Sequence, residues 1–342
     1  MGMFTPLRPL NAPRGSHGPG FARYAVRFRD SRLTTLWKRL RPIVQWVGLA
    51  LVLVFVGLYL SRQWDAIREV SLTIHWPLLV ASQLVLTFGL GLLPLGNWTT
   101  LDDLGARLPP VTVWHIFYLS NMAKYLPGSI WALPSRAIFY NRQGVSKTKS
   151  GAALVWEVLL MVVSAALVSL LALRLLIRYV STEVFFAALV GLLVVALLFA
   201  LPSVRRFARR RLLRFEATLS LGGVVRTLGA YVVSWVVMGI AFAGMVASVA
   251  PAFDWAATPE LVGLFTGSWL VGFLAIFAPG GIGVRDLLLA LGLSAYLHDP
   301  LPTVIAVIAR VMWTIAELLG LGIVSLWRLV SQRRRQRQGA AL

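Results

Sequence analysis

The stretch IFAPGGIGVRD, residues 276–286, decides the fold, because it places a helix break and two charges between strongly apolar segments. Pro279 has no backbone N–H to donate, and the three glycines after it lower the cost of non-helical backbone. A helix that begins near Leu261 should therefore end here, with Arg285 at a depth where lipid would otherwise lie. Broken backbone is tolerated at membrane depth only where protein or a water-filled cavity receives its polar groups, which makes this stretch a candidate substrate site.

A second break lies upstream in KYLPGSIWALPSR, residues 124–136. Residues 127–130 repeat the order proline, glycine, small residue, isoleucine of residues 279–282, and an arginine follows each copy. Paired breaks of this kind are typical of secondary transporters, in which discontinuous helices form the substrate site.

The composition is that of a polytopic membrane protein. Of 342 residues, 58% are hydrophobic and 13% are charged, and the mean hydropathy is +0.76. Apolar runs fill most of the chain beyond Arg41, and the remaining loops are too short to form an independent core, so we expect no soluble catalytic domain. The chain has no cysteine, which excludes disulfides and thiolate ligands, and its four histidines lack metal-ligand spacing.

The net charge of +20 indicates a membrane surface rather than nucleic acid. Most of the 33 basic residues fall in the tails and in the loops that we assign to the cytoplasm, which is the positive-inside pattern. Lys124, Arg285 and Arg310 are the exceptions that lie inside apolar segments. We therefore predict a multi-pass protein with both termini in the cytoplasm.

The positions of the basic loops also decide how often the chain crosses. The run 111–133 is long enough to span the membrane. If it crossed fully, however, the basic segments 134–150 and 205–226 would both lie outside, against the positive-inside rule. We therefore expect this run to enter and leave the membrane on the same side. The pair 261–278 and 284–297 is interpreted as a second hairpin, because its second member is short for a span. We predict an all-α fold of about six full transmembrane helices and two re-entrant helical hairpins.

The two halves share one plan of two spans, a hairpin and a third span. Residues 42–173 form the first predicted repeat and residues 183–327 the second, in opposite orientation because three full spans are an odd number. This is an inverted-repeat architecture. The transmembrane domain at 42–330 then lies between a basic tail at 1–41, which has the composition of a disordered segment, and a second basic tail at 331–342.

Charged residues in the third span of each half are further candidates. Glu157 and Arg310 follow the two breaks at nearly equal distances, so we expect them to pair, either as a structural contact or within a substrate site. Glu317 shares a helix face with Arg310. Arg136 flanks the first break, where freed amides and its planar fork suit a phosphate, although its alternative role is that of an ordinary cytoplasmic basic residue.

Asp102 and Asp103 are the one candidate for enzymatic chemistry, since adjacent carboxylates at a cytoplasmic face can hold a divalent metal and a diphosphate. We expect the alternative, that they form the N-terminal cap and first turn of a helix after Thr99 and Thr100. We therefore assign no catalytic residue, no metal site and no cofactor.

Four features together resemble the lysylphosphatidylglycerol synthase transmembrane, or flippase-like, family: YLPG at 125–128, Glu157, PGGIGVRD at 279–286, and Arg310. The resemblance covers roughly residues 40 to 330 and implies a stand-alone member in the bacterial cytoplasmic (inner) membrane, without the aminoacyl-transferase domain. It implies a relation to the part of the multiple-peptide-resistance enzymes that moves aminoacylated phosphatidylglycerol between leaflets. Residues 129–131, SIW, depart from the family pattern, in which further glycine is common.

We expect a flippase or transporter of an anionic phospholipid or a polyprenyl-phosphate-linked glycan, more a transporter than an enzyme. Two alternatives stay open: a membrane-embedded lipid-linked glycosyl- or phospho-transferase, and a non-catalytic partner of a glycosyltransferase. The expected partners are a membrane lipid and either a glycosyltransferase or a second copy of the chain, and not nucleic acid. The candidate substrate-binding residues are Lys124, Tyr125, Pro127, Gly128, Arg136, Glu157, Pro279, Gly280, Gly281, Gly283, Arg285, Asp286, Arg310 and Glu317.

Overall fold

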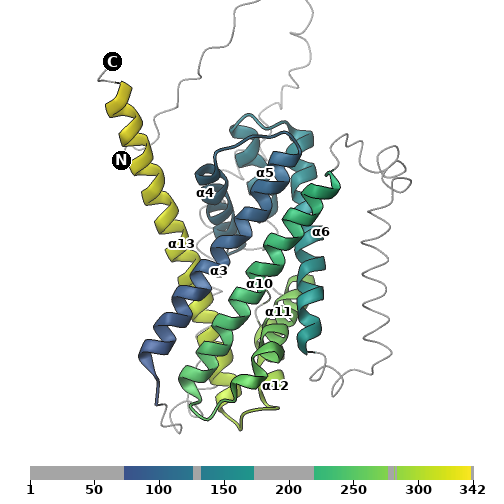
Figure 1. Ribbon diagram of the computed structural model, residues 1–342, viewed down its shortest axis with the longest axis vertical. Helices are drawn as coiled ribbons and strands as arrows, with labels where there is room; N and C mark the ends of the chain where they lie inside the picture. The colour runs from purple at the N-terminus through teal and green to yellow at the C-terminus, as the bar shows by residue number, and fades with distance from the viewer. Residues whose placement is uncertain (1–72, 126–131, 173–218, 276–280, 282, 340–342) are drawn as a thin grey trace, which may run out of the picture. The chain divides into compact units, whose positions relative to one another are not determined.

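Five helices in the described part of the chain are long and apolar enough to cross a membrane. The computed structural model describes residues 73–125, 132–172, 219–275, 281 and 283–339 (Figure 1). The five helices are α3 (Trp76–Asp103), α6 (Lys147–Ser169), α10 (Leu221–Val249), α11 (Thr258–Leu274) and α13 (Leu301–Gly339). The 28 residues of α3 extend about 42 Å, which exceeds the ~30 Å of a bilayer core. The chain is built as a multi-pass membrane protein.

Three further α-helices within the same residues are too short to cross. They are α4 (Pro110–Asn121), α5 (Ala132–Arg142) and α12 (Val284–Leu293), each about 15 to 18 Å long. The all-α class is thereby confirmed for the described residues. The first span of each predicted repeat, at 42–60 and 183–201, lies outside them, so the count of six full spans stays a prediction.

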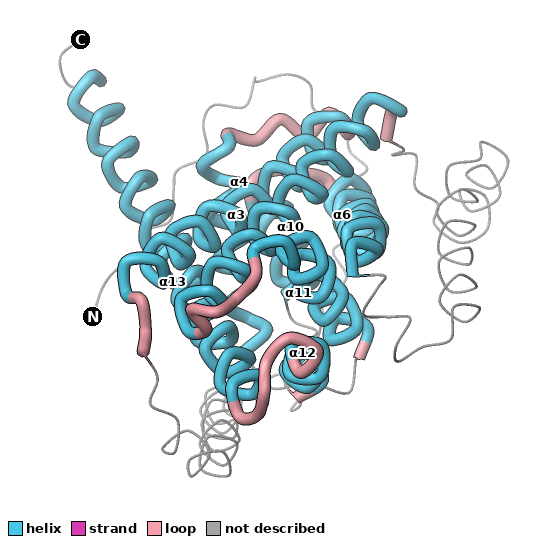
Figure 2. The backbone as a smooth tube through the Cα atoms, turned by 60° about the horizontal axis from the view of Figure 1, so that its bottom comes forward, coloured by secondary structure: helices cyan, strands magenta, loops and turns pink. Residues whose placement is uncertain are grey.

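The centre of the bundle is the pair α3 and α10, which pack along their length (Figures 1 and 2). Glycines bring the two backbones together: a Cβ at Gly89 would lie 2.7 Å from Met238, and one at Gly96 would lie 2.4 Å from Tyr231. Close approach through small residues is the usual way in which helices associate in lipid. The helices α6 and α11 pack against α10, and α4 and α13 pack against α3.

The helices α11 and α12 run antiparallel on the two sides of the second break. Near the break, a Cβ on Gly281 would lie 3.1 Å from the Cα of Gly272. At the other end, the hydroxyl of Tyr296, just beyond α12, donates a hydrogen bond to Glu260 in the first turn of α11. The start of α11 and the end of α12 therefore lie at the same end of the bundle. Figure 1 shows α11 and α12 in the lower half and α4 with α5 in the upper half.

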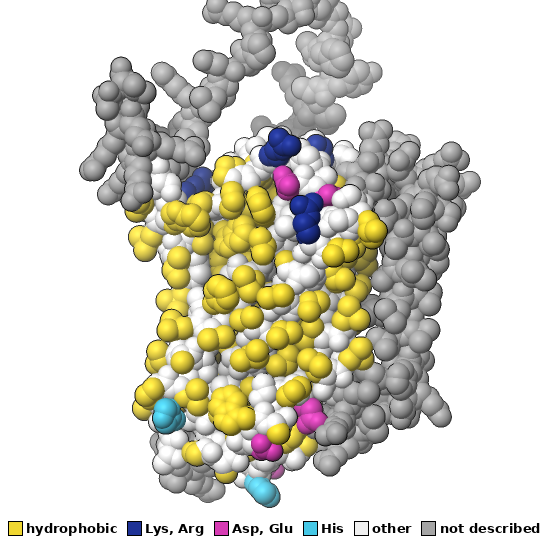
Figure 3. Space-filling model, viewed as in Figure 1, with side chains coloured by type: hydrophobic (Ala, Val, Ile, Leu, Met, Phe, Trp, Pro, Cys, Tyr) yellow, Lys and Arg dark blue, Asp and Glu magenta, His cyan; other side chains and the backbone are white. Residues whose placement is uncertain are grey.

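The two ends of the described bundle differ in charge (Figure 3). The loops and helix ends around the C-terminus of α3 carry Arg107, Arg142, Lys147, Lys149 and Arg226. At the opposite end, the described residues near the start of α3 and the end of α10 include no lysine or arginine, and the charged and histidine side chains there are His75, Asp254, Glu260, His298 and Asp299. The described part of the bundle thus has one basic end and one acidic end.

Candidate functional site

A buried arginine lies where α5 meets α4 and α6. Arg136, on α5, donates from Nε to the hydroxyl of Ser120 at 2.9 Å, from Nη2 to Asn121 Oδ1 at 2.6 Å, and from Nη1 to the carboxylate of Glu157 on α6. The guanidinium carbon also lies 4.4 Å from the ring centroid of Phe117. We call these five residues the α5–α6 cluster. Each nitrogen of the guanidinium has a partner, so the charge is held in one place.

The predicted partner of Glu157 was wrong. Glu157 pairs with Arg136 and not with Arg310, because α5 immediately precedes α6 in the chain and packs against it. The burial of Arg136 also excludes the alternative that it is an ordinary cytoplasmic basic residue. Arg310 pairs instead with Asp286 on α12, with its Nη2 at 3.9 Å from Asp286 Oδ2.

Polar side chains from α3, α5 and α10 surround the α5–α6 cluster. Tyr231 donates a hydrogen bond to Asn97 Oδ1 at 2.7 Å, and both side chains are buried. Tyr140 is buried beside Asn97, and both tyrosines lie within electrostatic reach of Arg136 and Glu157. A side-chain hydrogen bond links the Tyr140 hydroxyl to Asn97, so the polar contacts of Asn97 extend to both tyrosines.

The second charged cluster lies between α11, α12 and α13. Arg285 is buried, with its guanidinium carbon 4.9 Å from the ring centroid of Phe265 and 4.4 Å from that of Trp313. Both distances are within the range of cation–π attraction. Trp313 in turn donates from Nε1 to Glu317 Oε1 at 3.0 Å. We call these four residues, with Asp286 and Arg310, the α12–α13 cluster.

The break before α12 gives this cluster its shape. Gly281 and Gly283 have φ angles of +67° and +84°, which side chains other than glycine rarely adopt, and α12 begins immediately afterwards. Asp286 Oδ2 accepts a hydrogen bond from the backbone N–H of Gly283 at 3.1 Å. Its carboxylate therefore occupies the positive end of the helix dipole and faces Arg310 at the same time.

The two clusters repeat one arrangement. In each, an arginine on the helix after the break stacks on a phenylalanine of the helix before it. An ion pair also joins the helix after the break to the long helix that follows, and the positive and negative partners are exchanged between the two clusters. The pairs are Arg136 with Phe117 and Arg136 with Glu157 in the first half, and Arg285 with Phe265 and Asp286 with Arg310 in the second.

The remaining predicted residues lie at the edges of the described backbone. Lys124 and Tyr125 end the short helical turn Met122–Tyr125 after α4. Pro127, Gly128, Pro279 and Gly280 lie outside the described residues. A substrate-binding role for the fourteen candidates stays a prediction.

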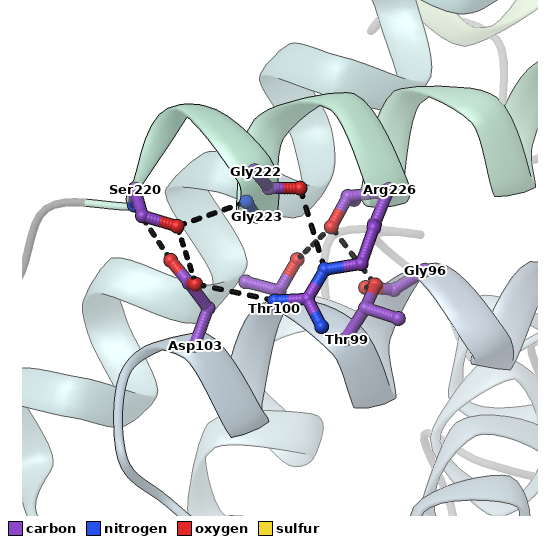
Figure 4. A network of polar contacts seen from close by, with 9 residues as sticks. Gly96, Thr99, Thr100, Asp103, Ser220, Gly222, Gly223 and Arg226 are labelled. Atoms are coloured by element: carbon purple, nitrogen blue, oxygen red, sulfur yellow. Dashed lines mark hydrogen bonds and ion pairs between the residues drawn. The ribbon is translucent and has the colours of Figure 1, made fainter.

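The two aspartates predicted to begin a helix instead stand at the end of α3. Figure 4 shows Asp103 against the first turn of α10, where its carboxylate accepts hydrogen bonds from the backbone N–H and the hydroxyl of Ser220, both at 2.6 Å, and lies 3.4 Å from Arg226. Asp103 thus caps the N-terminus of another helix, while Asp102 is exposed. No group of three or more potential metal ligands occurs among the described residues.

Sequence reasoning missed the aromatic and neutral polar residues in and around both clusters. They are Asn97, Phe117, Ser120, Asn121, Tyr140, Tyr231, Phe265 and Trp313. One signal was available: the two phenylalanines precede their arginines at nearly the same distance in each half. The others are common residue types in apolar helices and carry no signal of their own.

Comparison with known protein families finds a match that covers most of the chain. The family model described as the lysylphosphatidylglycerol synthase TM region matches residues 45–325 of this chain. The match includes α3, α4, α5, α6, α10, α11 and α12, most of α13, and both clusters. A search of curated proteins gives no match.

Proposed function

We propose, since the chain belongs to the lysylphosphatidylglycerol synthase TM region family, that it moves an anionic lipid between the leaflets of a bacterial cytoplasmic membrane. The substrate class is a phospholipid or a polyprenyl-phosphate-linked glycan. The observation that carries the proposal is the buried arginine that follows each interruption between helices, Arg136 after α4 and Arg285 after α11. An arginine at the centre of a bilayer costs about 2.5 to 3.5 kcal/mol on insertion scales, so two of them indicate a function.

Three observations support two re-entrant hairpins related as an inverted repeat. The helices α4, α5 and α12 are too short to cross, α11 and α12 are antiparallel, and the pairs α4–α5 and α11–α12 lie in opposite halves of the bundle. The exchange of signs between the two clusters is a further parallel. In this architecture, substrates bind near the midplane where the broken helices meet.

The basic end of the bundle is the cytoplasmic end in this proposal, according to the positive-inside rule. Single cysteines introduced at Asp254 and His298 should then be labelled from outside, and one at Arg142 only from inside. The chain has no cysteine of its own, so the labelling is unambiguous. Opposite labelling of Asp254 and His298 would contradict the re-entrant assignment of α11 and α12.

The α12–α13 cluster is the better docking site for the lipid phosphate. Its two arginines are matched by two acidic side chains, so an anion would bind there by replacing a carboxylate on an arginine. The contact between Arg310 and Asp286 is looser than that between Arg136 and Glu157, and the side chain of Arg310 is 23% exposed. A phosphate that takes the place of Asp286 would meet Arg310 and the amide of Gly283 together, a combination suited to phosphate.

The decisive assay is transfer of a headgroup-labelled anionic lipid in proteoliposomes. Arg310→Gln should abolish transfer while the protein still inserts and folds, because glutamine keeps hydrogen bonding but removes the charge. Arg285→Lys should weaken transfer, because an ammonium lacks the planar fork. Arg142→Gln, at an exposed position outside both clusters, is the matched control. Wild-type transfer by the Arg285→Ala, Arg310→Gln double variant would end the proposal.

The transferase alternative is not proposed, because it relied on Asp102 and Asp103. Both carboxylate oxygens of Asp103 bind the N-terminal turn of α10, which competes with metal binding. Native mass spectrometry of the purified protein would identify the lipid that remains bound and so narrow the headgroup.

A further inference from the structure

A row of polar side chains leads from the basic end of the bundle to the α5–α6 cluster. Asn97, Thr100 and Asp103 are three residues apart on α3 and share one face of that helix. Each meets polar groups of α10 across the tightly packed interface of the two helices. Tyr231 bonds to Asn97, Thr227 lies 3.2 Å from Thr100 between their hydroxyl oxygens, and the N-terminal turn of α10 bonds to Asp103. We call this row the polar ladder.

The outer end of the polar ladder lies at the surface. Figure 4 shows Asp103 joined to Ser220 and to the exposed Arg226, with Thr100 and Thr99 beside it along α3. The next step inwards is a group of three hydroxyls, because Thr227 also lies 2.9 Å from Thr99. Successive steps are one helical turn apart, about 5 Å, a gap that one water molecule or one side-chain rotation can bridge.

The inner end of the polar ladder lies within electrostatic reach of the buried ion pair. Tyr231 and Tyr140 both interact electrostatically with Glu157 and Arg136, and a side-chain hydrogen bond links Tyr140 to Asn97. Tyr231 also donates to Asn97, so hydroxyl and amide groups continue from Thr100 to the surroundings of the carboxylate. A continuous row of such groups that ends near a carboxylate is what the passage of a proton requires.

We propose that the polar ladder carries protons from the cytoplasm to Glu157, and that proton binding there is coupled to lipid movement. This inference rests on the proposed function. A proton from cytoplasmic water forms an O–H bond with the carboxylate of Glu157, and the ion pair with Arg136 opens. Arg136 then becomes a second site for the lipid phosphate, which docks first at the α12–α13 cluster, and a phosphate oxygen takes the place of the carboxylate. When the proton leaves, the carboxylate binds Arg136 again and the phosphate is released.

The surroundings of Glu157 leave few other groups that could exchange the proton. From α5 it is faced by Arg136 and Tyr140, and from α10 by Tyr231. From α3 the neighbouring polar group is the neutral Asn97. The only titratable residue of α11 is Glu260, in the first turn of that helix, and α6 itself carries only the two lysines of its first turn. Within the described residues, the polar ladder therefore provides a polar route from the basic end of the bundle to the surroundings of this carboxylate.

The first test needs no substrate. Infrared difference spectra of the purified full-length protein, recorded through a pH titration, should contain the carbonyl stretch of a protonated carboxylic acid that Glu157→Gln removes. After transfer to heavy water this band shifts as deuterium replaces the proton. The rate of that shift should be at least several-fold lower in a Thr100→Val, Thr227→Val variant than in the wild type. Thr87→Val is the matched control, because Thr87 lies on α3 but bonds only to the neighbouring Gln83. Absence of the band, or an unchanged rate in the double valine variant, would overturn the inference.

The second test measures coupling in proteoliposomes that contain a trapped pH dye and labelled anionic lipid. An imposed proton gradient should change the rate of wild-type lipid transfer several-fold, with proton movement recorded by the dye, and should have no effect on Glu157→Gln. Transfer that ignores the gradient in the wild type would refute the coupling and leave the proposed lipid transport intact. No transfer under any condition would refute the transport itself, while the infrared band still decides whether Glu157 binds a proton.

Discussion

Removal of one partner of the Arg136–Glu157 pair should destabilise the protein far more than removal of both. Their side chains are only 2% and 4% exposed, so Glu157→Leu leaves a guanidinium charge buried in an apolar bundle. Such a loss typically costs 3 to 5 kcal/mol. Ser120 and Asn121 still bind the other two nitrogens, which places the expected loss near the lower limit, about 3 kcal/mol. The Arg136→Leu, Glu157→Leu variant should unfold within about 1 kcal/mol of the wild type.

The measurement is the free energy of unfolding from titration with SDS in mixed micelles, completed as a double-mutant cycle. The comparison is Arg310→Gln, since that ion pair has a separation of 3.9 Å and side chains that are 23% and 10% exposed. Its loss should cost less than that of Glu157→Leu, because Asp286 keeps its hydrogen bond from the backbone N–H of Gly283 and its place at the start of α12. Equal losses in Glu157→Leu and Arg310→Gln, or a double variant as unstable as Glu157→Leu, would refute the reasoning.

Three further outcomes are expected. Gly239→Ala should lower the melting temperature sharply, since its new methyl group would lie 2.7 Å from a backbone carbon of α11, whereas Gly229→Ala on the same helix meets nothing within 4 Å and should be neutral. Asp103→Asn should cost about 1 kcal/mol of unfolding free energy through the weakened cap of α10, and the exposed Asp102→Asn almost nothing. Burial, reinforced by the neighbouring Arg328, lowers the pKa of His115 in the folded protein below the ordinary value of 6.5. As the pH falls below 6.5, the unfolded chain therefore takes up a proton at His115 before the folded protein does. Unfolding free energy should therefore decrease below that pH in the wild type and less in His115→Gln, as thermal scans over a pH series would measure.

The sequence was sufficient to locate the second break and the helices around it. The proline and glycines of residues 276–286 predict where helix must end, and α11 does end at Leu274 while α12 begins at Val284. This succeeds because a missing N–H donor and a positive φ are local properties of the residues themselves. Hydrophobic length is equally local, and it predicts the long helices.

The ion pairs could not be predicted, because they depend on which helices are neighbours. Glu157 and Arg310 share a position in their repeats, but position in a repeat does not bring α6 and α13 together, and Glu157 binds the nearer Arg136. The cap that Asp103 forms on α10 also depends on which helices are neighbours, so it could not be predicted either. Its partner Ser220 is 117 residues away in the chain, so nothing near Asp103 indicates the contact.

The close contact of α3 and α10 restricts how the molecule can move. These helices belong to different predicted repeats, and at Gly89 and Gly96 their approach leaves no room even for a methyl group. Sliding or rocking at this seam would first have to pull the two backbones apart. The α3–α10 interface should therefore stay fixed, and under the proposed transport function the parts free to change position are the short helices beside it.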